Sequence, residues 1–195
     1  MVIYGDERSG NCLKVKYTAD ALGLGYDWHA IDIMAGESRS TEFLAQNPQG
    51  QVPVVVLASG EILAQSNAII RYLANGSALL PARPLAQAKV DDWLFWEQYS
   101  HEPYVAVCRF QMLYQSLSAD QREPERVRRV EAALAFMDSQ LHDHAWLDRT
   151  AFSIADIALL AYTRLAHEGG FDLSCYAARQ DWVGRCERQL GLSAN

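Results

Sequence analysis

Residues 52–73, with the sequence VPVVVLASGEILAQSNAIIRYL, decide the fold of the first part of this chain. The β-branched run at residues 52–57 predicts a strand, Ser59-Gly60 predicts a turn, and residues 61–63 predict a second short strand. This pattern is typical of a β-hairpin. The apolar positions of residues 66–74 then recur at helical spacing, which predicts a helix with one face in the core.

The segments before the hairpin alternate strand and helix signals. Residues 2–4 predict a short strand, and residues 12–24 predict a helix with a stop signal at Gly23. A second strand is expected within residues 26–33, and a short helix at residues 40–45. The resulting order, β-α-β-α-β-β-α, predicts an α/β sandwich in which a helix joins two parallel strands and the hairpin closes one edge.

A run of turn-forming residues and prolines separates this α/β part from an all-helical part. The run occupies residues 75–84, so we expect a first domain at residues 1–77 and a second domain at residues 86–195. The second domain shows helical periodicity without alternating strand formers. The helices that this periodicity predicts lie within residues 86–115, 123–142 and 153–167.

The composition is that of a globular protein that binds neither nucleic acid nor a membrane. Of 195 residues, 50% are hydrophobic and 21% are charged, which is enough apolar material for a core. The 17 Lys and Arg residues against 24 Asp and Glu residues give a net charge of -7, which disfavours binding to a phosphate backbone. No apolar run approaches the roughly 20 residues of a membrane span, and the first residues lack the features of a signal peptide. We therefore expect a cytoplasmic protein.

The cysteines predict neither a disulfide framework nor a metal site. Because they lie far apart without a C-x-x-C pair, reduced thiols are expected. His142 and His144 are poorly spaced for a metal site on a helix, so no metal is expected. The cysteines are Cys12, Cys108, Cys175 and Cys186.

Four motifs occur in a characteristic order along the chain. They are Ser9-Gly10-Asn11-Cys12, NPQGQVP at residues 47–53, QSNAIIRYL at residues 65–73, and Ser153-Ile154-Ala155-Asp156. Together they resemble the glutathione S-transferase family, in particular its bacterial, theta-, nu- or beta-like members of the serine or asparagine type. The resemblance implies a thioredoxin-like domain at residues 1–77 that binds glutathione. It also implies an all-helical domain at residues 86–195 that forms most of the second-substrate pocket.

The resemblance assigns glutathione contacts to the loop before the hairpin. It implies that the main chain of Val52 pairs with the cysteinyl part of glutathione and that the Val52–Pro53 bond is cis. It places Gln51 near the glycyl end of the peptide and makes Arg39 a candidate partner of the glycyl carboxylate. A proline at the start of a strand is usually structural, and Gln51 and Arg39 could each be a solvated side chain.

Gln65 and Ser66 stand at the start of the helix after the hairpin. Unpaired N–H groups and the helix dipole favour an anion there, and the γ-glutamyl carboxylate of glutathione suits that place. Ser66 could equally be a plain N-cap. Many family members carry an acidic residue where this chain has Gln65, so the amino group of the ligand would meet a neutral acceptor instead.

The catalytic question lies in the loop that precedes the first helix. Glutathione reacts as a thiolate, whereas a free thiol has a pKa of about 8.5, so the enzyme must stabilise the anion. Ser9 matches the serine of the theta-like and zeta-like classes, and Asn11 matches the donor of a bacterial class. We expect Ser9 to act on the sulfur with help from Asn11. A role of these residues as helix N-caps is compatible with that function.

Cys12 offers a second interpretation of the same loop. Ser9-x-x-Cys12 occupies the place of the C-x-x-C motif of thioredoxin-like redox proteins, and a cysteine in a first helical turn can be activated. Only the exposed first position of that motif normally attacks. We therefore expect Cys12 to be a buried small side chain that faces away from Ser9.

The helical half contributes structural motifs and substrate-pocket candidates. Ser153 and Asp156 predict a capping box, and Trp93 and Trp96, one turn apart, predict packing of the core or of a domain interface. The resemblance directs the inner face of the first long helix toward the glutathione sulfur. The candidates for the second-substrate pocket are Tyr104, Arg109 and Tyr162, although an arginine on a helix is usually solvated or paired.

The resulting hypothesis is a cytoplasmic, homodimeric glutathione transferase with glutathione as co-substrate, which detoxifies small, largely apolar electrophiles. One alternative is a noncatalytic binding or scaffold protein of the same fold, which should lose Ser9 and the Gln65-Ser66 pair. A second is a zeta-like glutathione-dependent isomerase, which should carry a serine in place of Asn11. A third is a thiol transferase that uses Cys12.

Overall fold

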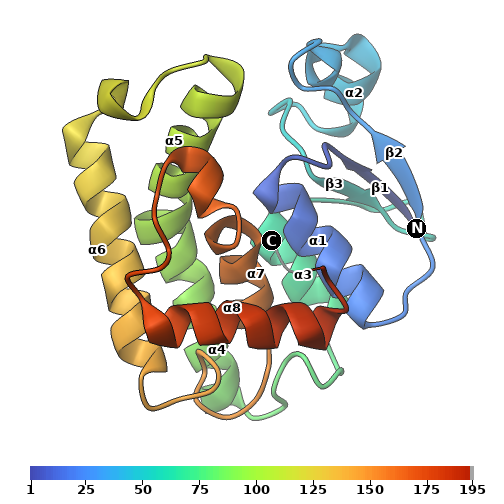
Figure 1. The fold of residues 1–195 in the computed structure, drawn as a ribbon. Coiled ribbons are helices and arrows are strands. Elements are labelled where there is room, and N and C mark those ends of the chain that lie inside the picture. Colours follow the sequence, from blue (N-terminus) through green and yellow to red (C-terminus); the bar gives the residue numbers. More distant parts are fainter. Residues whose placement is uncertain (194–195) are drawn as a thin grey trace. The chain divides into compact units, whose positions relative to one another are not determined.

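The computed structural model describes residues 1–193 and divides into two units, the first spanning Met1–Ser77 and the second beginning at Ala78 (Figure 1). The second unit starts before residue 86 because Leu79 and Leu80 are already buried in it. The carbonyl of Leu79 also accepts a hydrogen bond from the N–H of Ile154, at 3.0 Å. The segment rich in turn formers is therefore anchored to the helical unit.

The first unit has the element order that the sequence predicts. Its helix α1 begins at Gly10, and α3 is followed by a turn at Gly76 with a φ of 75°. The elements are β1 Val2–Gly5, α1 Gly10–Ala21, β2 Asp27–Ala30, η1 Glu37–Arg39, α2 Thr41–Gln46, β3 Val54–Val56, β4 Ile62–Ala64 and α3 Ser66–Leu73.

The four strands form a mixed sheet in the order β2-β1-β3-β4. Strands β1 and β2 are parallel, with α1 between them in sequence, whereas β3 pairs antiparallel with both β1 and β4. The turn of the β3–β4 hairpin contains Gly60 with a φ of 91°, a conformation that only glycine adopts easily. This thioredoxin-like arrangement confirms the predicted fold class.

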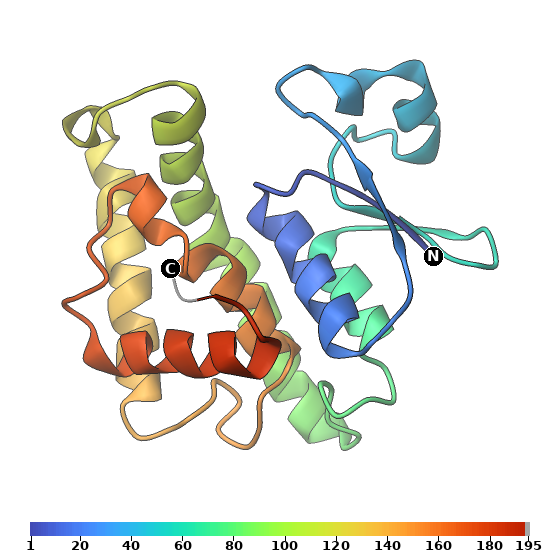
Figure 2. The same cartoon turned by 45° about the vertical axis from the view of Figure 1, so that its right-hand side comes forward.

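The two faces of the sheet are covered by different helices. Val54 pairs with Tyr4 in the register of β1 and β3, and both pack with Phe43 of α2. The next pair, Ile3 and Val55, points to the opposite face and is fully buried. Helices α1 and α3 lie side by side on that face (Figure 2). The sandwich therefore has α2 on one side and the pair α1 and α3 on the other.

The second unit is all-helical and includes a helix that the sequence pattern did not reveal. Its elements are α4 Pro84–Trp96, η2 Glu97–His101, α5 Glu102–Tyr114, η3 Ala119–Gln121, α6 Pro124–Leu141, α7 Ile154–Thr163, η4 Ala166–Gly169 and α8 Ala177–Leu190. The unpredicted helix is α8, whose buried positions include charged residues such as Arg179 and Glu187. Because these positions do not look apolar, hydrophobic periodicity misses the helix.

Helix α7 is the centre of this unit, and all of its residues are buried. It contacts α4, α5 and α8. The predicted capping box is present at its start: the N–H of Ala155 donates to the Ser153 hydroxyl, and the N–H of Ser153 donates to Asp156, at 3.0 Å. The box fixes where the central helix begins.

The predicted helix at residues 86–115 is a continuous run of α4, a π-helical turn and α5. A π-helical turn, η2, separates α4 from α5, and Pro103 is the second residue of α5. Proline has no N–H to donate to the preceding turn, and such wide turns occur where the regular pattern is interrupted. Among residues 1–193, none of the helices combines the length and apolar character that spanning a bilayer requires.

Candidate functional site

The start of α1 has no side-chain cap. Ser9 occupies the N-cap position with an extended backbone, but its side chain makes no capping hydrogen bond. The preceding turn is held instead by Asp6, whose carbonyl accepts from the N–H of Ser9 and whose carboxylate accepts from the N–H of Arg8. The first turn of a helix presents N–H donors that have no partner within the helix. The loop therefore leaves the positive end of α1 open to an added acceptor.

The starts of α1 and α3 are joined directly. The hydroxyl of Ser66 donates to Oδ1 of Asn11 at 3.0 Å, and Ser66 is buried while Asn11 is half-buried. Because the two residues lie in the first turns of two packed helices, the positive ends of both helix dipoles meet at this contact. The structure thus brings together two predicted site residues, Asn11 and Ser66, while Ser9 stands at the N-cap of α1.

Gln65 holds a backbone conformation that is unusual for a residue with a side chain. Its φ of 69° lies in the left-handed region, and the residue occupies the N-cap of α3 without a side-chain capping bond. Such conformations cost energy and cluster at ligand sites. The side-chain amide donates from Nε2 to Oε1 of Gln49 at 3.1 Å, so the carbonyl oxygen of Gln65 is turned away from Gln49.

The loop that contains Gln49 is built by two polar contacts. The Nη1 of Arg39 donates to the main-chain carbonyl of Gln49 at 3.1 Å, and Nδ2 of Asn47 donates to the carbonyl of Gln51 at 2.8 Å. Gly50 has a φ of 62°, and a Cβ atom there would lie 2.5 Å from Nη1 of Arg39. The left-handed φ explains the glycine in this motif, because other residues adopt that conformation only with strain.

One exposed side chain of this loop, Gln49, contacts the N-cap residue of α3. Gln51 is exposed, and the Val52–Pro53 bond is cis, as predicted. The contact of Gln49 with Gln65 connects the loop to the open start of α3. Gln49 and the buried Asn47 were not among the residues predicted to contact glutathione. Their position within the motif at residues 47–53 was the only sequence signal for these two residues.

Cys12 is fully buried, as predicted, but its relation to Ser9 differs from the expectation. Burial raises the pKa of the Cys12 thiol to about 12, although hydrogen bonds from the Ser9 side chain and the Asp6 backbone oppose the rise. The expectation that the two side chains face apart is therefore wrong, because they are in contact. The thiol is protonated at neutral pH, and a buried neutral thiol is a poor nucleophile.

The candidates from the helical unit have different surroundings. Tyr104 is half-buried, with the guanidinium of Arg129 5.9 Å from the centre of its ring. Arg109 is buried and forms an ion pair with Glu168. Tyr162 is buried in the apolar cluster that includes Val105. Arg109 and Tyr162 therefore have internal packing roles, and Tyr104 is the most accessible of the three.

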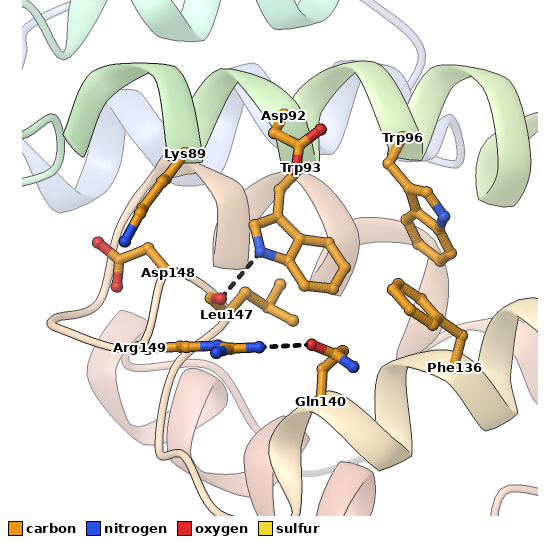
Figure 3. A pocket seen from close by; sticks show the side chains of 9 residues that line it. All are labelled: Lys89, Asp92, Trp93, Trp96, Phe136, Gln140, Leu147, Asp148 and Arg149. Carbon is orange, nitrogen blue, oxygen red and sulfur yellow. Dashed lines mark hydrogen bonds between the residues drawn. The ribbon is translucent and has the colours of Figure 1, made fainter. Parts of the chain in front are cut away.

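Trp93 and Trp96 belong to an aromatic cluster at the surface of the helical unit (Figure 3). Their ring centres are 5.4 Å apart, and both rings lie against Phe136 of α6. The indole N–H of Trp93 donates to the carbonyl of Leu147 at 2.8 Å, beside a cavity of about 240 Å³. These contacts are those of packing residues and agree with the predicted structural role.

The fold and this geometry define a class of protein. It is a two-domain class in which a thioredoxin-like unit with a cis-proline loop is followed by an all-helical unit. A family model described as "Glutathione S-transferase, N-terminal domain" matches residues 8–75.

Individual relatives extend this match over most of the chain. The chain is 31% identical over 163 residues to glutathione S-transferase 3 of Zea mays, covering 79% of this chain and 72% of that protein. The crystal structure of a glutathione S-transferase from Pseudomonas fluorescens is 48% identical, with a TM-score of 0.92, covering 95% of this chain and 94% of the other. A glutathione S-transferase structure from Xanthobacter autotrophicus is 41% identical, with a TM-score of 0.89, covering 95% and 92%. The chain belongs to the glutathione S-transferase family.

Proposed function

We propose that this protein is a glutathione transferase that joins the thiolate of glutathione to a small, largely apolar electrophile. The observation that carries the proposal is the hydrogen bond between Ser66 and Asn11, which brings two uncapped helix starts together in a chain of this family. One helix start can serve the γ-glutamyl carboxylate, and the other can serve the sulfur.

The binding roles follow from the charge at each position. On binding, the hydroxyl of Ser66 turns from Asn11 to the γ-glutamyl carboxylate, which also accepts from the first N–H groups of α3. The side-chain carbonyl of Gln65 accepts from the ligand's amino group. The main chain around Val52 and Pro53 pairs with the cysteinyl part of the peptide. Exposed Gln51 and the guanidinium of Arg39 bind the glycyl end.

The chemical step requires stabilisation of an anion and correct positioning. The thiol of glutathione loses its proton to solvent, the sulfur then forms a bond to an electrophilic carbon, and the electron pair passes to the acceptor or leaving group. The hydroxyl of Ser9 donates to the sulfur, and the amide of Asn11 assists. A pKa lowered by about two units corresponds to roughly 2.7 kcal/mol. Ser9 exchanges a weak contact with the Cys12 thiol for this stronger, charge-assisted bond.

The helical unit supplies the second-substrate pocket in this proposal. Tyr104 is the residue proposed to touch the electrophile, since its ring is partly accessible. Arg109 and Tyr162 support that pocket from within, because one is paired with Glu168 and the other lies in the core.

The proposal includes a homodimer. The segment formed by α4 and η2 exposes three large apolar side chains, with exposed fractions of 67% for Leu85, 76% for Phe95 and 81% for Tyr99. Apolar surface of this kind is stabilised by burial against a partner. Sedimentation at tens of micromolar should show a dimer, and a Phe95→Asp/Tyr99→Asp double variant should sediment as a monomer. A wild-type monomer would contradict this part of the proposal.

The proposed cellular setting is the cytoplasm, with detoxification as the role. The observation in its favour is that Cys12, Cys108, Cys175 and Cys186 are all free in the structure, which suits a reducing compartment.

The decisive experiment is isothermal titration with glutathione, followed by turnover measurements with a panel of electrophiles. Binding together with turnover of at least one electrophile supports the proposal. Binding without any turnover favours the noncatalytic alternative. Absence of heat at millimolar glutathione, with the folded state checked by circular dichroism, would overturn the proposal.

A further inference from the structure

A second cavity lies entirely within the helical unit. Its volume is about 580 Å³, and its walls come from the end of α7, from η4, from the loop 170–176 and from α8. Figure 1 shows α8 as the long red helix near the C-terminal end of the chain. The apolar part of the wall includes Phe171, Leu173 and Val183. All lining residues lie between positions 164 and 187, so the cavity contains none of the proposed glutathione contacts.

The wall of this cavity includes a buried cation, Arg179. Its side chain is fully buried, and its guanidinium stacks 4.2 Å from the ring centre of Tyr176. Nη2 donates to the carbonyl of Leu173 at 3.1 Å. Within residues 1–193, Nε and Nη1 have no hydrogen-bond acceptor. Burying guanidinium donors without acceptors is costly, and burial lowers the pKa of Arg179 to about 10.

The neighbouring acidic groups are already engaged elsewhere. Asp138 accepts the main-chain N–H of Arg179 at 2.9 Å, and Asp172 accepts from the N–H and the hydroxyl of Ser174, both at 2.8 Å. The buried Glu187 pairs with Arg164 at 3.0 Å. Asp138 and Asp172 favour the charged form of Arg179 through space, yet in the described part of the chain no hydrogen bond joins either of them, or Glu187, to its guanidinium. The guanidinium therefore lacks an anionic hydrogen-bond partner.

We propose that this cavity binds a small organic acid, with its carboxylate against Arg179 and its apolar body against Phe171, Leu173 and Val183. A carboxylate supplies the acceptor oxygens that the guanidinium lacks. A monoanion fits better than a phosphate dianion, because Asp172 and Glu187 also border the cavity and repel additional negative charge. Since neighbouring side chains cover Arg179, the ligand reaches it after a side-chain shift in the loop 170–176.

The test uses benzoate as the probe and benzamide as its uncharged match. Thermal unfolding of the full chain is measured with each compound at millimolar concentration. Benzoate should raise Tm by about 2 °C or more at saturation, whereas benzamide should leave it unchanged. Arg179→Met should abolish the benzoate shift.

A second pair of variants keeps the test decisive if Arg179→Met does not fold. Gly184 borders the cavity, and a Cβ atom there meets only Nη1 of Arg188, at 3.4 Å. Gly184→Ala should retain the benzoate shift, whereas Gly184→Phe should fill the space and remove the shift without altering Arg179.

Three outcomes would overturn the proposal. The first is an equal shift with benzoate and benzamide, and the second is an unchanged benzoate shift in Gly184→Phe. The third is loss of the shift when S-methylglutathione is present, which would place benzoate in the glutathione site. The proposal does not depend on transferase activity, so a catalytically inactive protein leaves this test intact.

Discussion

The N-terminus of α7 has a side-chain cap, whereas the N-termini of α1 and α3 have none. At α7, Ser153 and Asp156 satisfy the first N–H groups from within the chain, and both residues are buried. At α1 and α3, the N-cap residues Ser9 and Gln65 make no side-chain capping bond. All three are helix N-termini, whose first N–H groups have no partner within the helix itself.

This difference in capping shows that a helix N-terminus can contribute either to stability or to ligand binding. A cap supplied by the chain contributes about 1 kcal/mol to stability. A helix start without a cap keeps its donors and its positive dipole end for a ligand. In the proposed division of roles, the Ser153–Asp156 cap at the start of α7 serves folding, and the starts of α1 and α3 serve glutathione binding. Variants of the residues at these helix starts test this division, in order of decreasing expected effect.

Removal of Asp156 should have the largest effect on stability. Its carboxylate accepts from the N–H of Leu147, from the indole N–H of Trp182 and from Ser153. Asp156→Ala leaves these buried donors without an acceptor and should lower the free energy of unfolding by about 4 kcal/mol, as measured by urea denaturation. Exposed Asp120 accepts from the hydroxyl of Ser118, the N-cap of η3, and is the control: Asp120→Ala should cost less than about 0.5 kcal/mol. Collapse of glutathione affinity in Asp156→Ala without lost stability would contradict the division.

The same carboxylate should produce a distinct pH dependence. Burial raises the pKa of Asp156 from 3.8 to about 6, although its hydrogen bonds oppose the rise. Between pH 4 and pH 6 the folded protein therefore binds more protons here than the unfolded chain does. The free energy of unfolding should decrease by about 3 kcal/mol as pH rises through this window, relative to Asp156→Asn, which does not titrate. Parallel pH profiles of the two proteins would refute this expectation.

Ser9 and Cys12 both lie at the start of α1, and we expect Ser9 to act on the glutathione sulfur and Cys12 to serve packing only. Ser9→Ala should raise the pKa of bound glutathione and lower turnover tenfold or more, since one pKa unit corresponds to about 1.4 kcal/mol, with glutathione binding retained. Cys12→Ala should leave turnover within a few fold. The measurements are the pH dependence of kcat and the intact mass after incubation with oxidised glutathione. Lost activity in Cys12→Ala, with a glutathione adduct on Cys12 of the wild type, would instead identify a thiol transferase.

Alanine substitution of two serines compares the capped start of α7 with the uncapped start of α3. Ser153→Ala should cost about 1 kcal/mol of stability through the lost cap, with the Kd for glutathione unchanged. Ser66→Ala should leave stability within about 0.5 kcal/mol and raise that Kd several-fold, because it removes a ligand donor and the contact with Asn11. Calorimetric titration and urea denaturation of both variants measure the two quantities. Equal profiles for the two variants would show that the starts of α3 and α7 have the same role.

The sequence alone determined the features that depend on neighbours along the chain. The β-branched run before Ser59-Gly60 specifies the hairpin, and the serine three residues before Asp156 specifies the capping box. These signals survive in one sequence because turn chemistry and capping act over two to four residues. The order of elements in the first unit follows from the same local rules.

Tertiary structure decided the features that depend on distant partners. The contacts of Ser66 with Asn11 and of Gln65 with Gln49 join segments 55 and 16 residues apart, and no local pattern encodes them. The contact of Ser9 with Cys12 depends on side-chain direction, and the pairing of Arg109 with Glu168 depends on where two helical segments meet. Helix α8 was missed because long-range packing buries its charged positions. Local propensity fixes which elements form, whereas burial and pairing between elements fix which side chains remain available for chemistry.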